Sequence, residues 1–385
     1  MTNIPLAITN CNAVLENGII FDATILVAGE RIAAVGRAAE LEIPTGTPVL
    51  DAEGRYAGPG FVDIHVHGAI GKNINFEPDA VAEYYLKNGT TTILAAPWYT
   101  MNMETILRSI STVREAMGRV RTLAGLYMEG PFTNPTYGSH AKDNPWHRGA
   151  VEEDYRTIVD AAGDAARVWT VAPEVAGVKD FVEYAKRVNP DAVIAVGHSE
   201  ATPEEIRALG KNRPTLGTHV TNATAQRGRG QGIVGVGPDE YCLSNDEVYC
   251  ELISDSRGIH VKSDVQRLMM RAKGVDKMVL ITDGSTHKGP VPEKYKGVTD
   301  INFSVYGEVA GSALTMNAAC RNVMSHTRVG ITEAFLMASR NPARVIGLDG
   351  EIGTIEVGKR ANIVLVNDRF DVFGVVLDGE KVEVI

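Results

Sequence analysis

The stretch that decides the fold is Gly60-Phe61-Val62-Asp63-Ile64-His65-Val66-His67-Gly68. Its apolar and β-branched residues predict a short buried strand, with Pro59-Gly60 before it and Gly68 after it. Alternate side chains of a strand share a face, so His65 and His67 point the same way at its carboxyl end. Buried imidazoles need partners, and two on one face can hold a divalent metal ion. The stretch therefore predicts a metal site, against the alternative of two polar residues on a solvated strand end.

Outward from this stretch, apolar segments alternate with amphipathic ones as far as residue 344. Eight strands are expected, at Phe61–His67, Thr91–Ala96, Thr122–Met128, Val168–Pro173, Ala192–Gly197, Thr215–Val220, Val248–Ser254 and Met278–Thr282. Helical runs lie between them, for example Met103–Met117, Glu152–Ala162, Val178–Val188 and Pro203–Gly210. This alternation favours an α/β fold of the (β/α)8 TIM-like barrel type, with a doubly wound open sheet as the alternative.

The two ends of the chain have a different pattern, of short strands and tight turns. Residues 1–57 predict a small antiparallel β layer with turn signals such as Glu16-Asn17-Gly18, and the pattern returns after residue 345. We therefore expect two domains. A small β-sandwich domain would be built from both termini (1–57 and 345–385), and the catalytic barrel would span 58–344.

Composition excludes several classes of protein. The chain has 385 residues, of which 44% are hydrophobic, and a formal net charge of −10, which argues against nucleic acid as a partner. No apolar run approaches the roughly 18 residues of a membrane span, and the first residues lack the pattern of a secretory signal. Four scattered cysteines without C-x-x-C spacing are typical of a reduced, cytoplasmic protein.

Candidate chemistry lies where barrel enzymes collect it, at the carboxyl ends of the strands. Five of the eight expected strands end in a potential metal ligand or carboxylate: His65 and His67, Glu129, His198, His219, and Asp283. Such nitrogen and oxygen ligands predict a catalytic metal site, with Zn²⁺ as the default and Fe²⁺, Mn²⁺ or Co²⁺ tolerated. Hydrolysis also needs a proton shuttle, and Asp283 is the natural one.

Pro59 to Gly68 resembles the entry motif of the amidohydrolase superfamily. Further motifs are similar, in order and spacing, to those of the N-acetylglucosamine-6-phosphate deacetylase family: Glu129-Gly130-Pro131-Phe132, Gly197-His198-Ser199, Thr218-His219 with Asn222-Ala223, Thr282-Asp283, Gly311–Met316 and Asn341-Pro342-Ala343-Arg344. Glu129 favours this branch, because cyclic-amide hydrolases typically have a carboxylated lysine as the bridging ligand.

The resemblance implies hydrolysis of N-acetylglucosamine-6-phosphate to glucosamine-6-phosphate and acetate. It implies Glu129, His198 and His219 as principal metal ligands, and His65 and His67 as ligands of a second ion. Asp283 would be the general base and then the general acid, while His260 would steady the carbonyl oxygen. Implied substrate contacts are His140, Asn222, Ala223, Arg229 and again His260. Family dimers supply the phosphate-binding arginine across their interface, which implies a homodimer; Arg227 competes with Arg229 for this role.

Departures from the family pattern leave the substrate open. They fall at Val220-Thr221, at Thr224, at Gly284–Lys288 and at Lys288–Lys296. Another N-acyl sugar, an N-acyl amino acid or a cyclic amide is an alternative substrate, and an inactive binding protein is a further alternative. His287 and Lys288 would form an altered anion site unless their loop is simply solvated.

Three other features carry no function in this interpretation. The G-x-G-x-x-G spelled by residues 230–235 does not open a helix after a strand, so we reject dinucleotide binding. His147 and His326 lie away from the strand ends and are interpreted as surface or packing residues.

Overall fold

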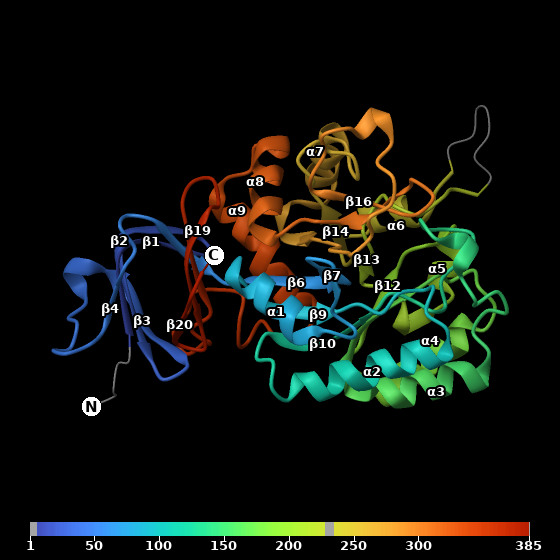
Figure 1. Cartoon of the computed structure of the whole chain (residues 1–385), viewed down its shortest axis with the longest axis horizontal. Coiled ribbons are helices and arrows are strands. Elements are labelled where there is room, and N and C mark those ends of the chain that lie inside the picture. Colours follow the sequence, from blue (N-terminus) through green and yellow to red (C-terminus); the bar gives the residue numbers. More distant parts are fainter. Residues whose placement is uncertain (1–5, 228–234, 385) are drawn as a thin grey trace.

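The computed structural model describes residues 6–227 and 235–384 (Figure 1). At its centre, eight parallel strands pair in the order β15-β14-β13-β12-β11-β10-β9-β6. Their bounds are β6 Phe61–Val66, β9 Thr90–Ala95, β10 Leu123–Met128, β11 Ala166–Val171, β12 Val193–Val196, β13 Leu216–Gly217, β14 Tyr249–Ile253 and β15 Met278–Ile281. All eight expected strands exist, and the barrel prediction is confirmed.

The barrel closes between its first and last strands. Val66 of β6 pairs with Gly284, just beyond β15, in a parallel bridge. Below this bridge, the fully buried Asp63 accepts a 2.5 Å hydrogen bond from Thr282 Oγ1. A Cβ on Gly284 would lie 1.9 Å from the hydroxyl oxygen of Tyr85, so only glycine fits beside that tyrosine. Packing therefore explains the glycine that departs from the family pattern.

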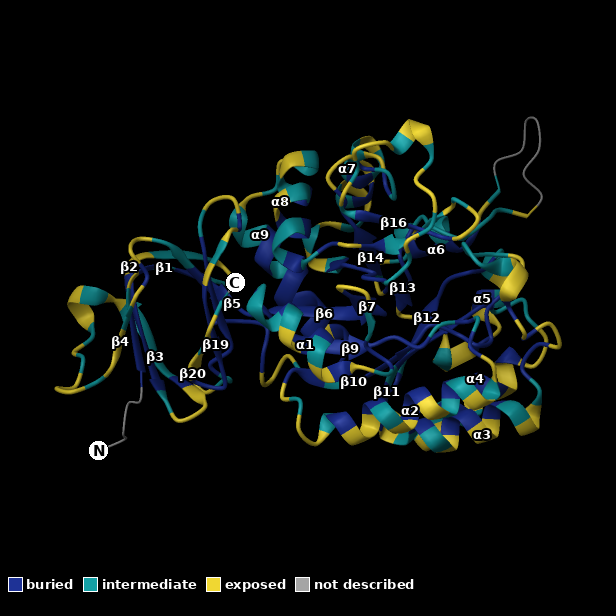
Figure 2. Ribbon diagram, viewed as in Figure 1, coloured by how far each residue is buried: buried dark blue, intermediate teal, exposed yellow. Residues whose placement is uncertain are grey.

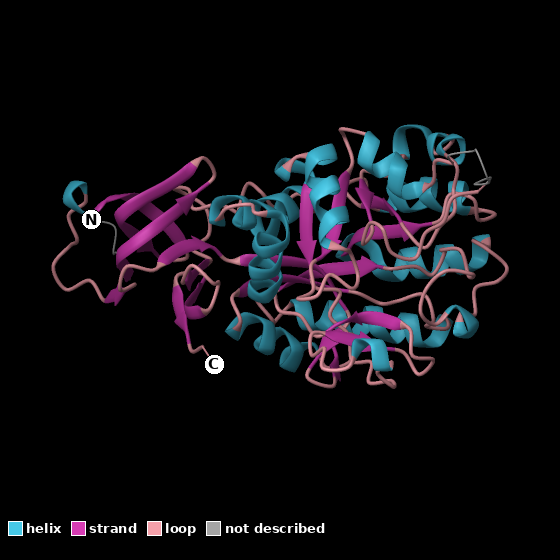
Figure 3. Cartoon of the chain, turned by 90° about the horizontal axis from the view of Figure 1, so that it is seen from above, coloured by secondary structure: helices cyan, strands magenta, loops and turns pink. Residues whose placement is uncertain are grey.

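Helices surround the barrel, with buried inner faces and exposed outer faces (Figures 2 and 3). In α2, Asn102 caps the first turn by accepting a 2.9 Å hydrogen bond from Thr105 N, and Ile106, Ile110 and Val113 are buried. The helices are α1 Pro78–Lys87, α2 Met103–Met117, α3 Glu152–Ala162, α4 Val178–Val188, α5 Pro203–Arg207, α6 Pro238–Ser244, α7 Ser263–Lys273, α8 Met316–Thr327, α9 Ile331–Phe335 and α10 Asn341–Val345. The expected helix at Pro203–Gly210 ends earlier, at Arg207.

Strands from both ends of the chain share a second sheet, seen beside the barrel in Figure 1. Its strands are β1 Leu6–Leu15, β2 Gly18–Ala28, β3 Arg31–Arg37, β4 Val49–Asp51, β5 Tyr56–Pro59, β18 Ile363–Val366, β19 Val372–Leu377 and β20 Glu380–Val382. The expected antiparallel layer is wrong in two pairings, because β1 runs parallel to both β4 and β5. The long connection from β3 to β4 lets the chain return in the same direction as β1.

The Asn341-Pro342-Ala343-Arg344 motif fastens the second sheet to the barrel. Asn341 Nδ2 donates to the carbonyl oxygens of Val275 and Met278, at 2.8 and 2.6 Å, where β15 begins. The neighbouring Arg340 and Arg344 both donate to Glu16 Oε1, at 2.9 and 2.8 Å. The motif is therefore structural in this chain.

Two short hairpins complete the described chain: β7 Gly68–Ala69 with β8 Lys72–Asn73, and β16 Ile301–Phe303 with β17 Val309–Ser312. No helix within residues 6–227 and 235–384 has the length and apolarity needed to cross a membrane.

Candidate metal centre and substrate cavity

Six of the predicted site residues meet at the carboxyl end of the barrel. His65 is on β6 and His67 directly follows it, while Glu129 directly follows β10; His198, His219 and Asp283 each come two residues after β12, β13 and β15. All six are buried, and none is more than 9% exposed. The structure thus brings together the whole set that the strand ends predicted.

Glu129, His198 and His219 form the tighter of two groups. Glu129 Oε1 lies 2.9 Å from His198 Nε2 and 3.0 Å from His219 Nε2, and the two nitrogens are 3.1 Å apart. Two ligand atoms that are each about 2.1 Å from one ion are themselves roughly 3 to 3.4 Å apart. The spacing and the donor set therefore fit a divalent metal ion.

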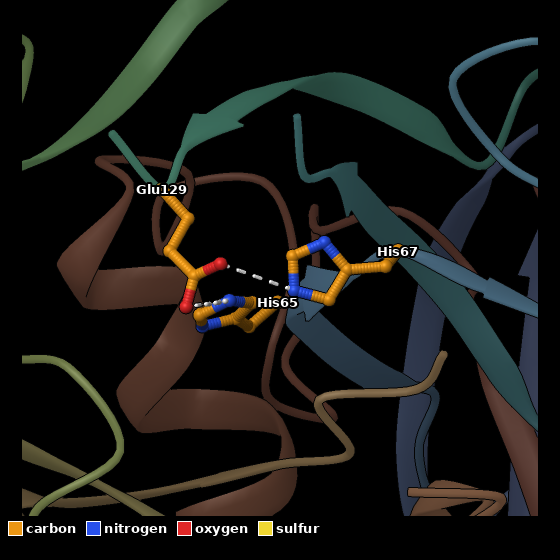
Figure 4. Close-up of side chains that lie close together, drawn as sticks. All are labelled: His65, His67 and Glu129. Atoms are coloured by element: carbon orange, nitrogen blue, oxygen red, sulfur yellow. Dashed lines mark ion pairs between the residues drawn. The ribbon is translucent and has the colours of Figure 1, made fainter. Parts of the chain in front are cut away.

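His65, His67 and Glu129 form the second group (Figure 4). His65 Nε2 is 3.6 Å from Glu129 Oε1, and His67 Nε2 is 3.4 Å from Glu129 Oε2. His65 Nε2 is buried and has no hydrogen-bond partner. An orphaned buried nitrogen beside a carboxylate is what a second cation would satisfy, so this group also fits an ion.

Charges and hydrogen bonds within these groups shift the pKa values of their members. Burial alone raises the pKa of Glu129, but the charge and hydrogen bond of His198 and the hydrogen bond of His219 hold it well below its usual range. Burial alone lowers the pKa of His219, yet the hydrogen bond and charge of Glu129 raise it to about 9. Without an ion, a proton on His219 therefore supplies positive charge beside the Glu129 carboxylate.

Asp283 adjoins the second group, and its Oδ1 lies 3.2 Å from His67 Nε2. Burial raises the pKa of Asp283, but the hydrogen bond from His67 and the charges of His65 and His67 lower it below its usual value. Its carboxylate is consequently ionised at neutral pH and able to accept a proton.

Strained turns aim three of these side chains inward. His198, His219 and Asp283 have φ values of 47°, 28° and 49°, in the left-handed region that residues with a side chain rarely adopt. Each turn lies just after the end of its strand, at the residue whose own side chain lines the cavity. Such strain persists where the surroundings impose it, and it gathers at functional sites.

A cavity of about 250 Å³ opens above these buried residues, which form its floor. His67, Glu129, His198, His219 and Asp283 line it, and so do the predicted substrate residues His140, Asn222, Ala223 and His260. His260 Nδ1 lies 3.3 Å from the buried Asp255 Oδ2, while its Nε2 is buried without a partner. Because a carboxylate only accepts, Nδ1 carries a proton, and Nε2 can donate only when the ring is doubly protonated.

Of the predicted anion-binding pair His287 and Lys288, only His287 lines the cavity above the metal groups. His287 lines the cavity and stacks on His140 with ring centroids 4.5 Å apart, and burial, with His140 next, lowers its pKa to about 4. Lys288 lines a second cavity, beside Tyr84 and Tyr85, which His287 also borders. Arg227 is paired with Glu200 and Glu205, at 3.2 and 2.8 Å, which leaves it poorly placed to bind a phosphate.

Arg229 and most of the 230–235 motif lie outside the described residues. His147 is exposed, and His326 hydrogen bonds to Gln266 at 3.0 Å. Sequence reasoning missed Glu251 and Asp255, which contact His65 and His260. A charged residue inside the apolar run Tyr249–Ile253 was a signal for the first of them.

Comparison with known proteins places these observations in a wider context. The model of the amidohydrolase family matches residues 56–382. The N-acetylglucosamine-6-phosphate deacetylase of Haemophilus influenzae is 28% identical over 97% of this chain and 98% of its own. The N-acetylgalactosamine-6-phosphate deacetylase of Escherichia coli O157:H7 is also 28% identical, over 95% of this chain and 96% of its own.

A solved structure shows the same likeness. It is a mutant N-acetyl-D-glucosamine-6-phosphate deacetylase from Mycobacterium smegmatis, in complex with N-acetyl-D-glucosamine-6-phosphate. It is 25% identical, with a TM-score of 0.82, and the match covers 99% of each chain. The resemblance seen in the motifs therefore extends over nearly the whole molecule.

Proposed function

Because this chain belongs to the amidohydrolase family, we propose that it hydrolyses the N-acetyl group of an amino sugar phosphate. The first candidate substrate is N-acetylglucosamine-6-phosphate, with glucosamine-6-phosphate and acetate as products. One observation carries the proposal: Glu129 Oε1 lies within 3.0 Å of Nε2 of both His198 and His219, at the barrel end where Asp283 also points.

Five side chains would hold the metal. Glu129, His198 and His219 would hold the principal ion, and His65 and His67, with Glu129 between the two groups, would hold a second. The imidazole and carboxylate donors favour Zn²⁺, with Fe²⁺, Mn²⁺ or Co²⁺ as replacements. When bound, such an ion makes water more acidic and polarises a carbonyl group.

Asp283 would move the proton. Its ionised carboxylate faces the cavity, and it would take a proton from the attacking water as the water adds to the amide carbon. The same carboxylic acid would then return that proton to the leaving nitrogen, so that the C–N bond breaks to give a neutral amine.

His260 would stabilise the negative charge that develops on the amide oxygen. It can do so by donating from Nε2 when the ring is doubly protonated. The backbone bonds that Asp255 accepts from Ile259 and His260, at 2.9 and 2.8 Å, fix the loop that presents the ring. Asp255 is therefore a positioning residue in this proposal.

The sugar would occupy the cavity above these groups, in contact with His140, Asn222 and Ala223. Asn222 donates from Nδ2 to the carbonyl oxygen of His260 at 3.0 Å, while its Oδ1 is left without a partner and able to accept from the substrate. The equal identity to enzymes named for N-acetylglucosamine and for N-acetylgalactosamine makes the second sugar a matching candidate.

We further propose the broader context of this activity. Arg229 would bind the phosphate of a substrate in the partner's cavity, which makes the enzyme a homodimer. The termini would form their own β domain (1–57 and 345–385) beside the barrel (58–344). Four free, buried cysteines support a cytoplasmic location.

The decisive experiment measures acetate release by metal-replete protein. The substrates are N-acetylglucosamine-6-phosphate, N-acetylgalactosamine-6-phosphate and unphosphorylated N-acetylglucosamine, and the control is Asp283→Asn. A rate on a phosphosugar that is lost in the control supports the proposal. No rate on any of them, with metal bound, refutes it and favours another N-acyl substrate; turnover of the unphosphorylated sugar with Arg229→Ala neutral would refute the phosphate role.

A further inference from the structure

Glu251 is a fully buried carboxylate in the middle of β14, beneath the metal centre. Its neighbours on the strand are Cys250 and Leu252, which are also buried. A carboxylate in such surroundings is costly unless hydrogen bonds or charges stabilise it. Its Oε2 atom has two partners, while Oε1 has none. Burying this carboxylate therefore costs free energy, and its two contacts show what it does at the site.

The first partner of Oε2 is His65 Nδ1, at 3.3 Å. Because an ionised carboxylate only accepts hydrogen bonds, this contact places the proton of a neutral His65 on Nδ1. The lone pair then lies on Nε2, which is buried, unpartnered and 3.6 Å from Glu129 Oε1. Glu251 thus selects the tautomer that points a ligand nitrogen into the site.

The second partner is the backbone N–H of His219, at 2.9 Å. This bond stabilises the turn at His219, where φ is 28°. In this turn the imidazole of His219 lies against Glu129. One oxygen of Glu251 therefore holds a residue from each of the two ligand groups. The ring of Tyr127 stacks on His65 with centroids 4.1 Å apart and fixes the remaining freedom of that imidazole.

We propose that Glu251 is a positioning residue of the metal centre, which sets the tautomer of His65 and the turn of His219 so that both can bind metal. The inference rests on the proposed ligand set and not on the proposed substrate. Losing a carboxylate that supports a ligating histidine weakens metal binding by about 10- to 100-fold.

The test measures metal affinity and stoichiometry, by competition between the protein and a chromophoric chelator for Zn²⁺ and for Co²⁺. Glu251→Gln keeps an oxygen that can accept both bonds but removes the charge, so we expect affinity about 10-fold weaker than wild type. Glu251→Met removes both acceptors at similar volume, and we expect about 100-fold. Asp239→Asn is the matched control, because the Asp239 carboxylate acts on His219 through its charge alone and bonds to Thr224.

Wild-type affinity and stoichiometry in both Glu251 variants, with the metal-free proteins folded, would overturn the proposal. An equal loss in Asp239→Asn and Glu251→Gln would also overturn it, because it would reveal a general effect of negative charge. If Glu251→Met does not fold, the Gln variant decides alone. No substrate enters the measurement, so an absence of deacetylase activity leaves its outcome intact.

Discussion

The floor and the outer wall of the substrate cavity are built in different ways. On the floor, Glu129, His198, His219 and Asp283 follow barrel strands directly or after one residue, and each is at most 9% exposed. On the outer wall, His140 and His287 come from loops and are only partly buried. The floor is held by short polar contacts between its members, and these two rings meet by stacking.

This difference separates the chemistry from the choice of substrate. Parallel strands fix the floor residues to within hydrogen-bond distances, which proton transfer and metal binding require. Loops tolerate substitution, and the departures from the family pattern at 284–288 lie in one of them. Changes on the floor should therefore lower kcat, and changes on the wall should alter KM.

The largest effect is expected for Asp283→Asn, which removes the proposed proton shuttle and nearly preserves the shape of the side chain. We expect kcat to fall about 1,000-fold, within the range known for general acid–base catalysis. Steady-state acetate release measures the change, and metal analysis of the variant is its control. A loss smaller than tenfold, with metal content unchanged, would show that another group transfers the proton. It would also contradict the expectation that changes on the floor lower kcat.

A smaller effect is expected for Asp255→Asn, one step removed from the reacting atoms. Asparagine can still accept from His260 Nδ1, but the bond loses the charge of the carboxylate and holds the ring less firmly. We expect kcat to fall about 10- to 100-fold with KM nearly unchanged, because the charge on the amide oxygen grows only in the transition state. A rise in KM at constant kcat would show that Asp255 serves substrate binding instead.

The floor was also the part that the sequence could predict. Buried parallel strands are short apolar runs, and a polar residue just after each run stands out, as Glu129 and Asp283 do. The ends of the strands were less certain. Thr215–Val220 was expected where β13 covers only Leu216–Gly217, because the left-handed turn at His219 ends the strand.

Features that depend on tertiary contacts escaped sequence reasoning. The parallel pairing of β1 with β4 and β5 leaves no trace in residue alternation, which is the same for either direction. Asp255 stands five residues before His260, but only the folded loop shows that their side chains meet. The contact of His287 with His140 joins segments almost 150 positions apart. The sequence therefore did not show that His287 lies on the outer wall of the cavity.

Asp255 should also make the stability of the fold depend on pH in acid. Burial raises the pKa of Asp255, but the bonds from His260 and from the Ile259 and His260 backbone lower it to about 2. Since the folded pKa is below the unfolded one, this carboxylate stabilises the fold above about pH 4, and the stabilisation disappears as pH falls toward 2.

Denaturant unfolding at pH 5 and at pH 2.5 measures this contribution. Wild type should lose at most about 2 kcal/mol more than Asp255→Asn over that interval, because the variant has no carboxylate to protonate there. Equal losses would mean that the contacts of Asp255 do not stabilise its charge, and the support proposed for His260 would fall with them.

The smallest effect is expected on the wall, for His287→Ala. The ring stacks on His140 over the cavity, and losing one such neutral contact costs about 1 kcal/mol. We therefore expect KM for the phosphosugar to rise about threefold to tenfold with kcat within a factor of two. Lys288→Ala is the matched control, because Lys288 is the next residue and does not line the substrate cavity, so its KM should match wild type. If His287→Ala instead lowered kcat as far as Asp255→Asn does, the wall would share in the chemistry, and the division between strands and loops would fail for this enzyme.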